Sequence, residues 1–223
     1  DDIPIIESKQ ISSGINFSNN GWLLSLDGYY KTVNGITSQS QGFQNQYEFV
    51  KSKGSYKATG VDILFRKQIK PVNIWISYAY MNNHYTFDEL ENESFPSNYD
   101  INHTVNFGTS YTNNNFKAAV GFNWHSGRPI TVPIEDAPIV NQNINYASTN
   151  AVNLKDFMRL DISTQYDFKI SNKMKGKAGV SVWNLLDKEN QVNTFYRVKN
   201  EAINQVLQRS LGITPNVSLR VYF

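Results

Sequence analysis

The chain has 223 residues, of which 21 are basic and 19 acidic, and its formal net charge is +2. This length permits one large all-β domain, and the charges are scattered without the basic run that nucleic-acid binding needs. Cysteine is absent, which excludes disulfides and thiolate metal sites. No run of about 18 apolar residues occurs, so a transmembrane helix is excluded, although barrel strands bury only every second side chain in lipid.

Nine segments alternate apolar and mostly polar side chains with the two-residue period of a β-strand. The first expected strand is Glu7 to Phe17, and the second begins with Trp22, Leu24 and Leu26 on one face. The apolar faces of the later strands are Val61/Ile63/Phe65, Ile74/Ile76/Tyr78/Tyr80, Val105/Phe107/Thr109/Tyr111, Phe116/Ala118/Val120/Phe122/Trp124, Met158/Leu160/Ile162/Thr164/Tyr166/Phe168, Ala178/Val180/Val182 and Val217/Leu219/Val221/Phe223. The pattern predicts an all-β protein.

The connections between these strands alternate in length. Short turns, rich in residues that tolerate tight-turn dihedrals, are expected at 18–21, 67–71, 113–115 and 171–173. Long polar segments are expected from Val33 to Gly54, Thr86 to Asp100, Gly127 to Asp156 and Asn190 to Gln208. Because a compact soluble domain rarely has several loops of more than about 12–15 residues, this alternation indicates an up-and-down outer-membrane barrel, with short periplasmic turns and long extracellular loops.

The last long segment contains a strand pattern of its own. Thr194, Tyr196 and Val198 occupy alternate positions, which predicts a hairpin that projects beyond the bilayer. Weak helical spacing over 201–211 is the alternative, but Gly212 follows it at once, and we expect the hairpin.

About nine membrane crossings are expected, and an odd number is informative. Bacterial single-chain barrels have an even number of strands, and an open edge leaves backbone groups unpaired in lipid at several kcal/mol each. We therefore expect another piece of polypeptide to supply the missing strands. The start of the chain, Asp1-Asp2-Ile3-Pro4, lacks the features of a signal peptide, so either a leader was removed or the chain begins within a longer protein.

Six short motifs follow one another along the chain. They are Ala58–Ile63, Trp75–Tyr80, His125–Ile130, Arg159–Ser163, Val182–Lys188 and Ser210–Asn216. Their order and spacing over nearly the whole chain resemble the C-terminal barrel region of TonB-dependent receptors, especially forms from Bacteroidetes-like bacteria. The last strand ends on an aromatic residue and resembles the terminal strand by which assembly machinery recognises outer-membrane barrels; its signal residues are Val217, Leu219, Val221 and Phe223.

The resemblance implies a transmembrane antiparallel up-and-down β-barrel of about 22 strands. Residues 1–223 would be its C-terminal segment and supply about nine to ten of those strands, while the family's plug domain is absent from this chain. The family implies a multi-pass protein of the Gram-negative cell outer membrane. Such a receptor binds a scarce nutrient of the siderophore, cobalamin, glycan or peptide class outside the cell and imports it with energy delivered by TonB.

The same resemblance implies the partners. They are outer-membrane lipid, the remaining N-terminal part of the receptor with its plug and missing strands, and the TonB complex, which acts through the plug. A surface lipoprotein that caps the barrel is a further partner that the sequence leaves open. Nucleic acid is not expected.

Candidate ligand-binding residues lie where the expected strands meet the outer loops. Aromatic and Arg side chains supply rigid apolar area and anion pairing at recognition sites. The candidates are Tyr85, Phe87, Tyr99, Trp124, His125 and Arg128. The alternative for each is the aromatic girdle at the membrane interface, which a barrel has whether or not it binds a ligand.

We expect no enzyme, no cofactor and no metal site. Motifs of hydrolases, phosphate loops and dinucleotide sites are missing, and the histidines lack metal-ligand spacing. Carboxylates such as Asp62, Asp161 and Asp167 are ordinary in a polar barrel interior. The acidic residues between 88 and 93 lack the oxygen spacing and the glycine of a calcium loop.

Two other functions stay open. A passive outer-membrane pore or small self-closed barrel predicts an even strand number and no partner chain. A soluble all-β binding or adhesion domain predicts solubility without detergent and polar residues in place of the outward aromatic belt.

Overall fold

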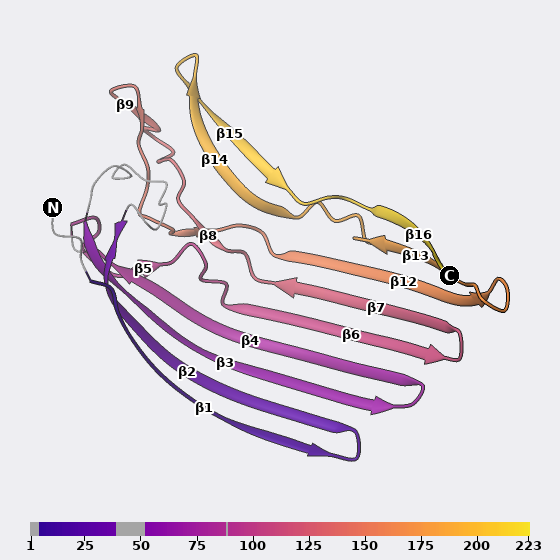
Figure 1. Ribbon diagram of the computed structural model, residues 1–223. Coiled ribbons are helices and arrows are strands. Elements are labelled where there is room, and N and C mark those ends of the chain that lie inside the picture. Colours follow the sequence, from indigo (N-terminus) through magenta and orange to yellow (C-terminus); the bar gives the residue numbers. More distant parts are fainter. Residues whose placement is uncertain (1–4, 39–51, 88) are drawn as a thin grey trace.

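A computed structural model describes residues 5–38, 52–87 and 89–223. Nine long strands dominate it: β1 (Glu7–Asn19), β2 (Trp22–Thr37), β3 (Lys53–Ile69), β4 (Val72–Thr86), β6 (His103–Asn113), β7 (Phe116–His125), β12 (Phe157–Lys169), β13 (Lys175–Trp183) and β16 (Thr214–Tyr222). They form one sheet in this order, and every neighbouring pair is antiparallel (Figure 1). The predicted all-β, up-and-down fold with nine long strands is confirmed.

The other strands lie in the connections. They are β5 (Phe95–Pro96), β8 (Pro129–Ile130), β9 (Ile139–Val140), β10 (Asn143–Ile144), β11 (Val152–Asn153), β14 (Gln191–Lys199) and β15 (Ala202–Arg209). β5 pairs with β4, β8 with β11, β9 with β10, and β14 with β15. The β14–β15 hairpin projects beyond the end of the large sheet (Figure 1). The predicted hairpin is confirmed, and the helical alternative for 201–211 is wrong.

Short and long connections lie at opposite ends of the sheet (Figure 1). The long ones at the loop end include 87–102, 126–156 and 184–213. The expected loop from Val33 to Gly54 is shorter than predicted, because β2 continues to Thr37 and β3 begins at Lys53. Its residues 39–51 lie outside the described part of the chain.

The strand register places the apolar side chains on one face. Directly paired residues point to the same side of a sheet. One such row crosses seven strands through Phe17, Leu24, Phe65, Ile76, Phe107, Phe122 and Leu160. Phe17 is 54% exposed and Leu24 is 44% exposed, so no layer of the described protein covers this apolar face. Lipid can cover it, since contact with hydrocarbon is what an outward barrel face requires.

The opposite face is mostly polar, as the interior of a wide barrel should be. A row of paired residues there runs through Asn16, Ser25, Leu64, Ser77, Asn106, Asn123 and Arg159. Arg159 Nε lies 3.0 Å from Asp161 Oδ2, and Lys177 Nζ lies 3.5 Å from Asp167 Oδ1. These carboxylates are therefore neutralised by neighbouring cations on the same face.

Two aromatic side chains on the polar face lie over glycines of the adjacent strand. A Cβ atom on Gly108 would be 2.4 Å from Trp75 Nε1, and one on Gly60 would be 2.4 Å from the Tyr29 hydroxyl oxygen. The glycines leave the space that the two rings occupy, so apolar surface is packed on this face without a second protein layer.

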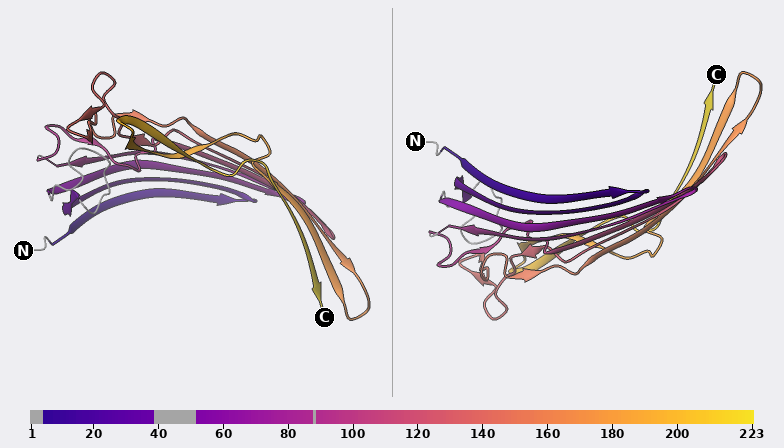
Figure 2. Two further views of the ribbon diagram at one scale, coloured as in Figure 1. Left: turned by 90° about the horizontal axis from the view of Figure 1, so that it is seen from above. Right: turned by 90° about the horizontal axis from the view of Figure 1, so that it is seen from below.

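The sheet is curved and twisted and has two open edges. Figure 2 shows the curvature from above and below, and the right-handed twist of strands accounts for it. Within the described residues, β1 and β16 each have one neighbour, so the sheet is an unclosed segment. No helix in these ranges is long and apolar enough to cross a membrane.

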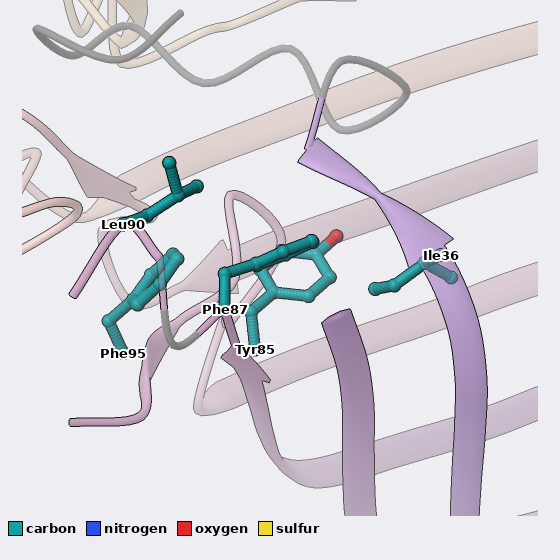
Figure 3. Packing of buried hydrophobic residues seen from close by; sticks show 5 residues of the cluster. All are labelled: Ile36, Tyr85, Phe87, Leu90 and Phe95. Carbon is teal, nitrogen blue, oxygen red and sulfur yellow. The ribbon is translucent and has the colours of Figure 1, made fainter. Parts of the chain in front are cut away.

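The buried hydrophobic core lies at the loop end. Ile36, Tyr85, Phe87, Leu90 and Phe95 form one cluster (Figure 3). The Phe87 ring lies 5.9 Å from that of Tyr85 and 6.3 Å from that of Phe95, measured between centroids. This core fixes the connection 87–102 against the ends of β2 and β4.

The two faces of the sheet make a testable prediction. Val120→Arg on β7 should destabilise the assembled protein by roughly 2–4 kcal/mol, because it places a guanidinium in hydrocarbon. Asn106→Arg on the neighbouring β6 is the matched control, since it faces the polar side. Denaturant titration in lipid vesicles, read by heat-modifiable gel mobility, measures the difference. Equal tolerance of the two variants would show that the faces are assigned wrongly.

Candidate ligand site at the loop end of the sheet

Three connections surround a hollow of about 390 Å³ at the loop end. The first is 87–102, the second is 126–156, and the third contains the β14–β15 hairpin. The residues that line the hollow are Asn98, Tyr99, Arg128, Pro129, Ile130, Thr131, Asn150, Val192, Asn193 and Thr194. The lining is mostly polar, and its purely apolar members are Pro129, Ile130 and Val192, whereas the usual small-molecule site is mostly apolar with a few directed polar groups.

Buried amide and carboxylate groups join the first two connections. Asn150 is 4% exposed, and its side-chain amide donates to the Pro96 carbonyl at 2.8 Å and to Asn98 Oδ1 at 2.7 Å. Nearby, Glu91 Oε1 accepts hydrogen bonds from the backbone N–H and the hydroxyl of Thr149, at 2.9 Å and 2.8 Å. Because these groups are shielded from water, each unmade bond is costly, and the two connections behave as one unit.

The root of the hairpin is fixed to the sheet by two other buried asparagines. Asn190 accepts from the Met158 backbone N–H and donates to the Met158 carbonyl, both at 2.9 Å. Asn184 donates to the carbonyls of Lys188 and Leu211, at 3.0 Å and 3.1 Å. The Asn190 bonds place the start of β14 beside the start of β12.

Arg128 spans the gap between the second connection and the hairpin. Its Nε donates to the Val192 carbonyl at 3.0 Å, and its Nη2 donates to Asn193 Oδ1. Burial lowers the pKa of the guanidinium, and nearby Tyr99 acts in the opposite direction. The group nevertheless stays charged at neutral pH. None of the four ion pairs in the described ranges involves Arg128.

The structure brings two of the predicted binding residues together. Tyr99 and Arg128 both line the hollow, and the Tyr99 side chain is open, since the residue is 69% exposed. Tyr85 and Phe87, in contrast, are 5% and 0% exposed. They belong to the core beneath the first connection and support its position, and a direct contact of either with a ligand stays a prediction.

Trp124 and His125 lie apart from the hollow. Trp124 pairs with Val105 and Met158 on the apolar face, which is the position expected of a girdle residue. His125 points to the polar face, where its ring stacks on that of Phe157 at 4.8 Å between centroids. Their role in binding stays a prediction.

Sequence reasoning did not find the amide and hydroxyl residues of the hollow. Asn98, Thr131, Asn150 and Asn193 stand in polar loops that contain many similar residues. No local sequence pattern distinguishes them. Asn150 has a φ of 57°, a conformation that Asn tolerates better than most residues, but this angle is visible only in the structure. The contacts that bring these residues together are long-range, and alternation within strands carries no information about them.

The acidic residues and the terminal strand were also predicted as possible functional features. The described ranges contain no group of three or more His, Cys, Asp or Glu that could hold a metal ion, and Asp88 of the acidic segment lies outside them. On β16, Val217 and Leu219 pair with Val180 and Ala178 on the apolar face. The part of this strand in barrel assembly stays a prediction.

A family model described as TonB dependent receptor-like, beta-barrel, matches residues 5–185. No curated protein sequence matches the chain significantly.

Two solved structures illustrate the likeness of fold. The ferric citrate transporter FecA, in its unliganded form, superposes with a TM-score of 0.67 at 14% identity, over 96% of this chain and 31% of FecA. FpvA of P. aeruginosa, solved with a bound pyoverdine–iron complex, gives a TM-score of 0.61 at 14% identity, over 97% of this chain and 27% of FpvA. At such identity the likeness concerns the fold alone.

The amide contacts of Asn150 give a second prediction. Asn150→Gly removes the side chain but keeps the positive φ accessible, so it should lower the local opening free energy of 89–102 by about 1–3 kcal/mol. Hydrogen exchange of the peptides from this connection measures that change. The matched control is Asn141→Gly, because Asn141 has a φ of 51° and an exposed side chain. Equal protection of 89–102 in both variants would contradict the role of Asn150.

Proposed function

Because the chain belongs to the TonB dependent receptor-like β-barrel family, we propose that it is the C-terminal barrel segment of a receptor that captures a scarce nutrient outside the cell. Proteins of this family are outer-membrane β-barrels that transport rather than catalyse, and this chain is accordingly an outer-membrane protein with many β-strand crossings. Its origin in a Bacteroidetes-like bacterium stays a prediction.

The chain spans 31% of FecA and 27% of FpvA. In the proposed receptor, the rest of the polypeptide supplies the missing strands and a plug domain. The two open edges of the sheet support this part of the proposal, since unpaired backbone groups are not tolerated in hydrocarbon. A small self-closed barrel or passive pore is disfavoured for the same reason, and the family's place in the outer membrane argues against a soluble adhesion domain.

The hollow at the loop end carries the proposal of ligand capture. It lies on the side of the long connections, which face the outside in barrels of this topology. The hydrogen bonds of Asn150 fix the first two connections, and those of Asn190 fix the β14–β15 hairpin. Tyr99 and Arg128 present an exposed ring and a charged group to the hollow. A ligand can therefore bind there without a large ordering cost to the loops.

Import itself is assigned to the parent receptor. The plug would receive energy from TonB, and a surface lipoprotein remains a candidate lid. Asp161 and Asp167 on the polar face are ion-paired with Arg159 and Lys177, an arrangement that suits the polar interior of a wide barrel.

Uptake by cells tests this function. A strain that lacks the receptor is complemented with the full-length protein and supplied in turn with ferric citrate, ferripyoverdine, cobalamin, an oligosaccharide and a short peptide as the sole source of the limiting nutrient. We expect growth and accumulation of at least one nutrient, and loss of both when a protonophore removes the energy for TonB. Accumulation that is independent of the receptor for every nutrient would contradict the proposal.

The same uptake assay tests whether the nutrient is captured in the hollow. Tyr99→Ala should reduce uptake at limiting nutrient about fivefold, because one well-placed aromatic contact at a recognition site contributes on the order of 1 kcal/mol. Val140→Ala is the control, since Val140 is 47% exposed at the tip of the β9–β10 hairpin and does not line the hollow. Similar uptake by the two variants would remove the hollow from the pathway.

A further inference from the structure

We propose that the hollow selects a small ligand that carries an anionic oxygen group, either a carboxylate or a phosphate, and that Arg128 binds this group. The inference rests on the proposed function and deepens it by naming the chemical class of the ligand.

The hollow has a single charged group. Arg128 is the one charged side chain among the described residues that line it. It has no acidic partner within the described ranges, although the structure partly buries it. A guanidinium removed from water without a counter-ion carries a desolvation cost, and an anion that enters the hollow offsets this cost.

The guanidinium of Arg128 has N–H groups left to bind an anion. Two of the five N–H groups of Arg128 donate to the hairpin, through Nε and Nη2. The others, which include both N–H groups of Nη1, have no acceptor in the described part of the chain. The planar fork of Arg is suited to carboxylate and phosphate, whose paired oxygens accept parallel hydrogen bonds.

The volume of the hollow and its apolar lining residues limit the size and the chemistry of the ligand. A volume of about 390 Å³ lies within the range of roughly 300–1,000 Å³ that is usual for small-molecule sites. Tyr99, Ile130 and Val192 place apolar surface beside the charged group. The site therefore fits a compact molecule with an acidic group and an organic body, and it is too small for a folded protein partner.

Isothermal titration calorimetry on the full-length receptor in detergent tests the inference. The probes are citrate for a carboxylate source, pyrophosphate for a phosphate source, and glucose as a neutral molecule of similar size. We expect the wild type to bind at least one of the two anions and not glucose, and the anion that binds identifies the source. Binding of glucose with equal affinity, or no binding of either anion, would overturn the inference.

Substitution of the cation gives the second arm. Arg128→Gln should weaken binding of the anion by about tenfold to a hundredfold, because a charge-assisted hydrogen-bond pair is lost. Arg197→Gln is the matched control. Arg197 is exposed on β14 and does not line the hollow, so its substitution should change affinity less than twofold.

A third variant separates charge from support. Arg128→Gln also removes the bonds to the hairpin, and a structural role alone could weaken binding through them. Asn193→Ala removes the Nη2 contact but keeps the guanidinium. Arg128→Lys is therefore the more direct comparison, because it keeps a positive charge but loses the guanidinium that bonds to the hairpin. We expect Arg128→Lys to retain more of the anion affinity than Arg128→Gln does; an equal loss in these two variants would show that Arg128 acts only by holding the hairpin.

The outcomes also separate the inference from the proposed function. If Tyr99→Ala reduces uptake while anion affinity is insensitive to Arg128→Gln, the hollow is a capture site and the anionic class is wrong. If neither substitution changes uptake or affinity, the hollow is not a capture site and both fail.

Discussion

A strand in a bilayer must pair every backbone N–H and C=O group with another strand, because hydrocarbon contains no water to replace these bonds. Between its two open edges, β1 and β16, the sheet meets this requirement by antiparallel pairing of sequential neighbours. Continuous register keeps Phe17, Leu24 and Phe65 in one row and leaves the opposite face to polar side chains. Only the connections are free of the requirement, and the long ones collect at one end, where three of them enclose the hollow.

The strands could be predicted because they are specified locally. Side chains at alternate positions carry enough information to place Val120 on one face and Asn106 on the other without knowledge of the neighbouring strands, and the observed register agrees. The bounds were less accurate at the loop end. There, β2 continues to Thr37 and hydrogen-bonding continues past the apolar pattern, because pairing extends as long as the partner strand does, whatever the side chains are.

The site was predictable only in part. Aromatic and Arg residues at strand–loop junctions include Tyr99 and Arg128, which line the hollow, but also Phe87, which is 0% exposed. Residue type did not separate these cases, because an aromatic ring is equally suited to a core and to a binding surface. The bonds of Asn150 and Asn190 span 54 and 32 residues along the chain, and such pairings become visible only once the loops are folded.

Two sets of aromatic side chains on the apolar face limit the membrane in which the chain fits. Trp22 and Phe116 lie near the short turns, and Tyr30 and Trp124 lie eight residues further along the same strands. At about 3.3 Å per residue and a tilt of about 35–45°, the two sets are separated by about 20 Å along the membrane normal. This separation suits a hydrocarbon layer thinner than the average of about 30 Å. In a thicker bilayer, hydrophobic mismatch would draw the polar residues beyond the rings into hydrocarbon, so bilayer thickness itself favours residence in the outer membrane.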